Sequence, residues 1–482
     1  MGSREYTVVV VSRRVVVLRE AKDLLEPVVL SEAKDLLLAV AFVVAGALSL
    51  APAPVLAQAP SPSAIISARD RMAARPLWPG FDPRTIPLAI YDGTRTVLVH
   101  HPAPPAGFTP LSGAPGFYSM PGRHRAVTAN SSDTIGGVMT ATLMPPSARA
   151  TAREIAAVSI HEAFHVFERA HHTSWSANEA DAFTYPVDRD ALAARRREYA
   201  LLRLALAAPN SGDAKCHAAV ALVERQQRFA AMNSEHGAYE RKSELNEGLA
   251  QYVQWRALGA SDARAVPDSM PMPGAARAHA YHAGPAWGRL LDRFASQWRD
   301  ALEREDTLAL DQLLWRAVGH VETERPRCGL TNEQRRDIDD GAAGASTELS
   351  LGRRIQWQSF EHASGPRLEI VADAALLWPQ GFDPLNVSLV APGELLHTRF
   401  VKAGNDHGTI EVLGRRSRTT SAGAHPLFNG MRALTVTGLD SAFVVRAAGD
   451  TVVIEARGVS GRFVRARVER SGDTTRVLLR AP

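Results

Sequence analysis

The pattern of apolar and polar positions changes twice along the chain. From Leu77 to about Met144, short apolar runs alternate with Pro- and Gly-containing turns, which is typical of β-strands. From Thr151 to about His320, long segments that mostly lack Gly and Pro dominate, and the pattern predicts helices over residues 151–172, 189–208, 214–232, 243–258, 283–303 and 308–318. From about Gln356 to the end, polar and apolar residues alternate again, with Gly-Asp pairs at hairpin positions.

These three patterns predict an α+β chain of several domains, since 482 residues are too many for one hydrophobic core. We expect a β-rich N-terminal region over 59–150, a mainly helical domain over 151–340, a linker over 341–355 and an all-β domain, a sandwich or a barrel, over 356–482. Residues 59–75 are rich in Ala, Pro and Ser and are interpreted as part of a leader.

One short sequence motif occurs twice. It is Leu77-Trp78-Pro79-Gly80-Phe81-Asp82-Pro83 in the first copy, and it recurs with one inserted residue over 377–384. Each copy precedes an apolar, strand-like run. We interpret both as turns that enter a strand and are anchored by an aromatic pair, rather than as a duplicated ligand surface.

The N-terminal segment 1–58 is expected to be a signal or leader segment. Residues 36–50 form an unbroken apolar run that follows Lys34-Asp35 and precedes a stretch of small residues ending at Gln58. The run is short for a membrane span, which favours cleavage over an uncleaved anchor. Residues 1–35 contain a near-repeat that a signal peptide does not need, so we expect the true start to lie further in. We therefore expect the protein to be secreted or periplasmic and, after cleavage of the signal segment, not stably inserted in a membrane.

The charge pattern bears on nucleic-acid binding, and the cysteine content bears on a possible disulfide. The 55 basic and 51 acidic residues are interspersed, and no basic stripe alternates with aromatic residues, so nucleic acid is not implied. Cys216 and Cys328 can pair in an exported protein, but the sequence leaves a disulfide and two free thiols equally open. Nothing in the pattern indicates an oligomeric state.

The segment His161-Glu162-Ala163-Phe164-His165 is the strongest chemical signal. On a helix its two imidazoles lie one turn apart on the same face, where both can bind one metal ion. Thr151 to Glu154 fits a capping box, and apolar residues occur on every side of the helix that follows. The helix should therefore be buried, and buried histidines need partners. Glu162 is placed to take a proton from a metal-bound water. Because five residues can match by chance, a third ligand is decisive.

Glu247 is the favoured third ligand. It lies on a predicted second helix within Asn246-Glu247-Gly248-Leu249-Ala250, where the small residues Gly248 and Ala250 should let that helix pack closely against the first. A carboxylate there completes a His/His/Glu set, which is a known ligand combination for a catalytic zinc ion.

Two other sources of a third ligand compete with Glu247. His171 completes a longer pattern, His-Glu-x-x-His-x-x-Gly-x-x-His, except that Glu168 replaces the Gly at which the helix would end. With Glu168 there the helix should continue, and His171 should not fold back. The remaining candidates are Glu179 and Asp181.

The motif pair over 161–165 and 246–250 resembles the gluzincin zinc metallopeptidases, whose third ligand is a Glu on a downstream helix. The resemblance covers about 150–320 and implies a zincin-like, mainly helical catalytic domain with a small sheet. The segment Tyr281-His282-Ala283-Gly284 resembles one in which a Tyr stabilises the oxyanion. Residues 136–140 lack the Glu and Asn that zinc aminopeptidases place there, so aminopeptidase activity is not expected.

We therefore expect an exported zinc-dependent peptidase that acts on a peptide or protein substrate. His161, His165 and Glu247 would hold Zn²⁺, Glu162 would be the general base, and Tyr281 would stabilise the oxyanion. A strand within 126–143 would pair with the extended peptide by edge addition. The alternatives are an exported zinc-binding or assembly protein without catalysis and a metzincin-like enzyme that uses the histidine at 171.

Overall fold

The computed structural model describes residues 59–144, 149–179, 181–259, 276–319, 328–423 and 425–481, together with the backbone of two strands near the N-terminus. These strands, β1 (Tyr6–Val11) and β2 (Arg14–Arg19), pair antiparallel within a unit that ends at Gln58, and the chain from Ala59 onward forms a second unit. The predicted signal run lies outside the described residues. Within the described parts of the chain, no helix combines the length and the apolar character that a bilayer span requires.

The N-terminal β-rich region forms a mixed sheet with the strand order β5-β6-β4-β3-β8-β7. Its strands are β3 (Leu88–Tyr91), β4 (Arg95–Val99), β5 (Thr109–Pro110), β6 (Phe117–Pro121), β7 (Ser131–Ile135) and β8 (Val138–Leu143). Strand β3 runs parallel to β8, and the other pairings are antiparallel. Strand β7 therefore lies at one edge of this sheet as far as the described residues extend.

The expectation that residues 59–75 are only a leader is wrong. Helix α2 (Pro62–Ala73) occupies this stretch, begins where the Ser61 side chain accepts a hydrogen bond from the Ala64 amide, and buries Ile65 and Met72 in the main core. The Ala-rich composition that resembled a leader is also a good helix composition. The short turn η1 (Pro83–Thr85) follows before the sheet begins.

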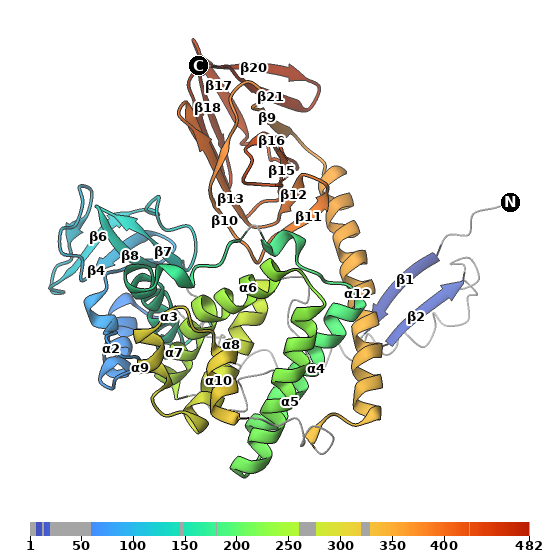
Figure 1. The fold of residues 1–482 in the computed structure, drawn as a ribbon. Helices are drawn as coiled ribbons and strands as arrows, with labels where there is room; N and C mark the ends of the chain where they lie inside the picture. Colours follow the sequence, from blue (N-terminus) through green and yellow to red (C-terminus); the bar gives the residue numbers. More distant parts are fainter. Residues whose placement is uncertain are drawn as a thin grey trace, which may run out of the picture. The chain divides into compact units, whose positions relative to one another are not determined.

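The helical region follows the sheet (Figure 1). Its helices are α3 (Ala152–His171), α4 (Arg189–Ala207), α5 (Ser211–Ala230), α6 (Ser234–Ser243), the π-helical turn η4 (Glu244–Gly248), α7 (Leu249–Leu258), α8 (Ala276–Phe294), α9 (Trp298–Arg304) and α10 (Leu310–Val318). Short turns η2 (Thr173–Trp175) and η3 (Asp181–Thr184) follow α3. The predicted helices are confirmed, except that the segment 283–303 is divided between α8 and α9.

Helix α3 is the centre of this region. The predicted capping box is present, since Thr151 and Glu154 each accept a hydrogen bond from the other's backbone amide. The helix packs against β8 on one side and α7 on the other, and most of its residues between Ile155 and Glu168 are buried. The buried helix expected from the apolar pattern is therefore confirmed.

The expectation of a linker over 341–355 is wrong, because helix α12 (Asn332–Glu361) runs through it. Thr331 and Gln334 form a capping box at its start, and Ala342 and Ala345 are buried where α12 packs against α4. Cys216 of α5 and Cys328 form a disulfide with 5.7 Å between their Cα atoms. It ties the residues just before α12 to the helical core.

The C-terminal domain is a β-sandwich, so the all-β expectation is confirmed, although its strands begin after α12 rather than at residue 356. One sheet has the order β10-β13-β14-β19-β18-β17 and the other β11-β12-β15-β16-β9-β21-β20, and their inner faces share one core. The strands are β9 (Arg367–Val371), β10 (Trp378–Phe382), β11 (Val387–Ala391), β12 (Glu394–His397), β13 (Phe400–Asn405), β14 (Gly408–Leu413), β15 (Ser417–Ser421), β16 (Met431–Val436), β17 (Val444–Ala448), β18 (Thr451–Ala456), β19 (Val459–Phe463), β20 (Ala466–Ser471) and β21 (Thr474–Leu479).

The two copies of the repeated sequence motif, over 77–83 and 377–384, adopt different structures. In the first copy Trp78 and Phe81 form an isolated bridge and are buried in the core, as expected for an anchored turn. The second copy forms strand β10 itself, and its Trp378 is 49% exposed.

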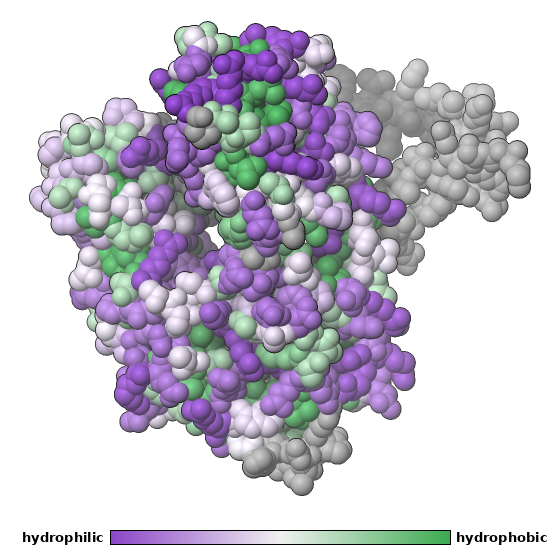
Figure 2. Space-filling view, turned by 45° about the horizontal axis from the view of Figure 1, so that its top comes forward, coloured by the Kyte–Doolittle hydropathy of each residue, from purple (hydrophilic) through white to green (hydrophobic). Residues whose placement is uncertain are grey.

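On the face drawn in Figure 2, hydrophobic residues form small groups between hydrophilic ones, so polar side chains cover most of that face.

Candidate metal centre

His161, His165 and Glu247 come together in the structure as the sequence predicts. The two histidine Nε2 atoms are 3.1 Å apart, and Glu247 Oε2 lies 3.5 Å from the first and 3.4 Å from the second. All three side chains are buried. One potential ligand atom from each lies within 4.8 Å of the other two, and among the described residues this is the group of side chains that could hold one metal ion.

These distances fit a zinc ion. Zinc binds imidazole nitrogen and carboxylate oxygen at about 2.0–2.2 Å with tetrahedral geometry, which places neighbouring ligand atoms about 3.4 Å apart. Glu247 Oε2 is also buried without a hydrogen-bond partner among the described residues, which is costly for a carboxylate unless a cation satisfies it. The donor set, the spacing and the unsatisfied oxygen all fit one divalent zinc ion.

Glu247 is positioned by the π-helical turn η4 and by a close contact with α8. A Cβ atom on Gly248 would lie 2.7 Å from the Cα atom of Gly284 and 3.0 Å from the carbonyl oxygen of Ala280. The expectation that Gly248 packs against the first ligand helix is therefore wrong, because its partner is α8, although α7 does pack against α3. A π-helical turn is often found at functional sites.

Glu168 and Asn246 connect the two ligand-bearing segments. Glu168 Oε2 accepts hydrogen bonds from His165 Nδ1 at 2.8 Å and from Asn246 Nδ2 at 2.9 Å, and its side chain is buried. A carboxylate on Nδ1 fixes the tautomer that presents Nε2 to a metal. Sequence reasoning missed this role, although Glu168 lies three residues after His165, on the same helix face.

The electrostatics of the cluster follow from its burial. Burial raises the pKa of Glu168 to about 7 even though the hydrogen bond from His165 opposes the shift. Burial favours neutral forms at His165 and Glu247 as well, but their mutual attraction outweighs it, so the pKa of His165 is raised well above its usual value and that of Glu247 is lowered. A proton on His165 would therefore compete with a metal ion.

Glu162 is buried beside His161, and together with His161, His165 and Glu247 it lines a cavity that is described below. Burial raises its pKa, while the neighbouring histidines oppose the shift. A carboxylate with a raised pKa is a stronger base than one in water, as expected for a group that accepts a proton from water near neutral pH.

Tyr281 and Arg277 reach the cluster from α8. The Tyr281 ring stacks on His161 with 5.8 Å between centroids, and its hydroxyl interacts with Glu247. Burial and Glu247 raise the pKa of Tyr281, so the hydroxyl remains a donor. Arg277 forms ion pairs with Glu247 and Glu179. Sequence reasoning missed Arg277, although its spacing of four from Tyr281 places both on one helix face.

The competing third ligands lie elsewhere. His171 is exposed at the end of α3 and packs on Phe167, with 4.5 Å between ring centroids. Glu179 binds Arg277 and accepts a hydrogen bond from Tyr239 at 3.1 Å. Asp181 accepts one from Asn178 at 3.2 Å. None of these candidates belongs to the converging group at the described site.

The cluster opens into a cavity of about 590 Å³. Its walls come from β7 and the residues before it, from α3 and α8, and from β10, β13 and the loop between residues 382 and 386 of the C-terminal domain.

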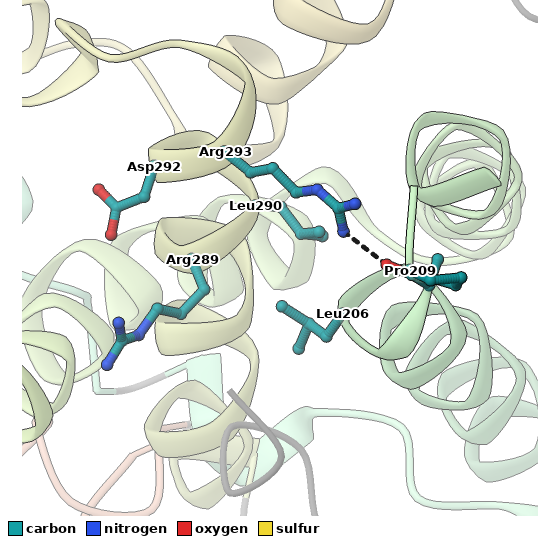
Figure 3. A pocket seen from close by; sticks show the side chains of 7 residues that line it. Leu206, Pro209, Arg289, Leu290, Asp292 and Arg293 are labelled. Atoms are coloured by element: carbon teal, nitrogen blue, oxygen red, sulfur yellow. Dashed lines mark hydrogen bonds between the residues drawn. The ribbon is translucent and has the colours of Figure 1, made fainter. Parts of the chain in front are cut away.

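A second cavity, between the end of α4 and helix α8, is lined by Arg289, Asp292 and Arg293 (Figure 3). There Arg293 donates to the carbonyl of Ala208, and none of the metal-centre residues line it.

The comparisons with known proteins add no family to this description. No protein-family model, no curated protein and no solved structure matches the chain.

Proposed function

We propose that the chain is a zinc-dependent peptidase with a gluzincin-like active site. The observation that carries the proposal is the position of Glu247, whose Oε2 lies within 3.5 Å of both imidazole Nε2 atoms. Three protein ligands of this kind leave a fourth position for water or substrate, as in catalytic rather than structural zinc sites.

The residues around the ligands supply the remaining chemistry of peptide hydrolysis. A zinc ion in such a site polarises the substrate carbonyl and lowers the pKa of water to about 7. Glu162 then accepts the proton of the attacking water and can pass it to the leaving amine. Tyr281 and Arg277 offer hydrogen-bond donors for the negative charge that develops on the carbonyl oxygen.

Strand β7 is the proposed binding edge for the substrate backbone. It pairs with β8 along one side, while its residues Ser131 to Asp133 line the cavity that contains the metal centre. An extended peptide can add to such an edge through main-chain hydrogen bonds. The order of sheet, α3 and a second ligand-bearing helix agrees with the zincin-like organisation that the resemblance implies, and we include this fold in the proposal.

Export is part of the same proposal. The disulfide between Cys216 and Cys328 supports it, because disulfides persist in secreted and periplasmic proteins and are rare in the reducing cytosol. The apolar run over residues 36–50 is the proposed signal segment.

The test combines metal analysis with a peptide-library digest of the zinc-loaded chain. We expect about one zinc ion per chain and hydrolysis that Glu162→Gln removes without loss of zinc. Glu333→Gln, an exposed carboxylate at the start of α12, is the matched control and should change neither property. Full activity of the Glu162 variant would refute the base, and zinc binding without hydrolysis of any peptide would favour the non-catalytic binding protein.

The choice of third ligand has its own test. Glu247→Ala should greatly weaken zinc binding, whereas His171→Ala should leave it unchanged, because the His171 side chain packs on Phe167. The opposite result would support the metzincin-like alternative.

A further inference from the structure

The C-terminal domain forms one wall of the cavity above the metal centre. Residues 380–385, Arg399, Phe400 and Lys402 line it together with β7 and α3. Strand β10 is the last strand at one end of its sheet, and β7 is the last at one end of the N-terminal sheet, within the residues that the structure describes. Two sheet edges therefore line the same cavity.

Direct contacts hold this wall against the rest of the unit. Arg123, which follows β6, forms an ion pair of 2.7 Å with Glu411 of β14. The rings of Phe183 and Phe382 lie 6.0 Å apart, which joins η3 to β10. The sandwich is thus fixed to both the β-rich region and the helical region around the cavity.

Three cations on the cavity walls have no acidic partner within salt-bridge distance among the described residues: Arg125, Arg169 and Lys402. Arg169 lies four residues after His165 on α3, and its Nη1 donates to the Ser132 carbonyl at 3.3 Å. Lys402 stands opposite Glu411 in the β13–β14 pairing, but Arg123 forms the ion pair with that carboxylate.

The other wall cations are already neutralised. Arg277 pairs with Glu179 and Glu247, and Arg399 pairs with Asp383 at 3.0 Å. On the acidic side, Asp133 and the buried Glu162 are the wall carboxylates without a salt bridge among the described residues. The five basic and five acidic side chains of the walls cancel formally, so a bound divalent zinc ion would make the cavity positive, with Arg125, Arg169 and Lys402 as its free cations.

We propose that this cavity selects extended polypeptide segments that carry acidic side chains, with Arg169 and Lys402 as the carboxylate-binding residues on opposite walls. The inference depends on the proposed function in that a peptide occupies the cavity. Alternate side chains of an extended peptide point to opposite sides, so a segment that lies along β7 can present carboxylates to more than one wall of the cavity.

The chemistry of the walls favours a polypeptide over a nucleic acid, although both can be anionic. Two strand edges offer unpaired amides and carbonyls that match a peptide backbone. Binding of single-stranded nucleic acid relies on several exposed aromatic side chains interleaved with the cations. Of the wall aromatics, Tyr281 stacks on His161 and Phe400 is buried. Phe382 is partly exposed, but it packs on Phe183.

The experiment measures binding of two fluorescent peptides to the zinc-loaded full chain carrying Glu162→Gln. One peptide has Glu at alternate positions, and the other has Gln at the same positions. We expect the acidic peptide to bind more tightly, and Lys402→Gln and Arg169→Gln each to weaken it by about fivefold, as for one exposed ion pair. The binding of the neutral peptide should not change. Arg432→Gln, an exposed arginine of β16 that does not line the cavity, is the control and should affect neither peptide.

Equal binding of the two peptides, or equal losses for both in the two variants, would overturn the inference. Tighter binding of a single-stranded oligonucleotide that competes with the acidic peptide would also overturn it. These results are distinguishable from failure of the proposed function. The two peptides are also incubated with the zinc-loaded chain that keeps Glu162. Preferred binding of the acidic peptide without any hydrolysis by that chain would support the inference alone, whereas hydrolysis of both peptides with equal KM would support the peptidase and refute the inference.

Discussion

The contact between Gly248 and Gly284 offers the sharpest test of how the metal centre is built. In Gly248→Ala the new Cβ would meet the Cα atom of Gly284 at 2.7 Å and the Ala280 carbonyl oxygen at 3.0 Å. Carbon atoms in contact normally lie about 3.5–4.0 Å apart, so η4 and α8 must separate by about 1 Å. Overpacking of this kind destabilises a core by about 1–3 kcal/mol, and we expect a loss of this size in the free energy of unfolding.

The same displacement should weaken zinc binding, because Glu247 directly precedes Gly248. Ligand distances in metal sites are held within about 0.2 Å, which is much less than the separation that the new methyl group requires. Tyr281 and Arg277, which contact Glu247 from α8, would shift relative to it as well. We expect the zinc affinity of Gly248→Ala to fall at least tenfold.

The matched control is Gly344→Ala in α12, where an added Cβ meets no atom within 4 Å. Alanine is favoured over glycine in a helix interior by about 0.5–1 kcal/mol, so this variant should be slightly more stable than the parent and bind zinc equally. Urea unfolding of the metal-free proteins and competition with a chelator measure the two quantities. If Gly248→Ala behaved like Gly344→Ala in both, the close helix contact could not be what positions Glu247.

Three further predictions concern single residues. Glu168→Gln should lower zinc affinity by about 10- to 100-fold in a chelator competition, since His165 Nδ1 loses its carboxylate, and an unchanged affinity would remove that role. Burial lowers the pKa of His397 to about 3, so between pH 6.5 and pH 3 the unfolded chain binds more protons and stability falls as pH falls, by roughly 3 kcal/mol at pH 4. His397→Gln should flatten this decline in urea unfolding, and an unchanged slope would contradict it. Cys328→Ser opens a disulfide with a sequence separation of 112 residues from Cys216 and should lower stability by about 2–5 kcal/mol, with no further effect of reductant; a variant as stable as the parent would count against this.

The helical region could be predicted because its local signals agree with one another. Segments such as 151–172 and 189–208, which have no Gly or Pro, and the capping box at Thr151 mark helix bounds through the local chain alone. The expected linker fails for the converse reason. Gly341 and Gly344 weaken a helix locally, but Ala342 and Ala345 pack against α4, and this tertiary contact outweighs the local preference.

The residues of the candidate metal centre could be predicted by type, but the geometry that brings them together could not. The pairing of two histidines one turn apart with a distant Glu is visible as a pattern of residue types. The π-helical turn that carries Glu247 and the crossing of Gly248 with Gly284 depend on α8, which lies far along the chain. Arg277 was missed for a related reason, since one arginine among many becomes significant only when its carboxylate partners are known.

Glu168 shows how one residue can decide between two kinds of site. Where the longer histidine motif has a Gly, the helix ends and the third histidine can turn back toward the metal. With Glu168, α3 continues to His171, whose exposed side chain then packs on Phe167 instead of the cluster. The same carboxylate accepts the hydrogen bond of His165 Nδ1. In the proposed site, the residue that keeps His171 away from the cluster thus also supplies a hydrogen-bond partner for His165, and Glu247 is left as the candidate third ligand.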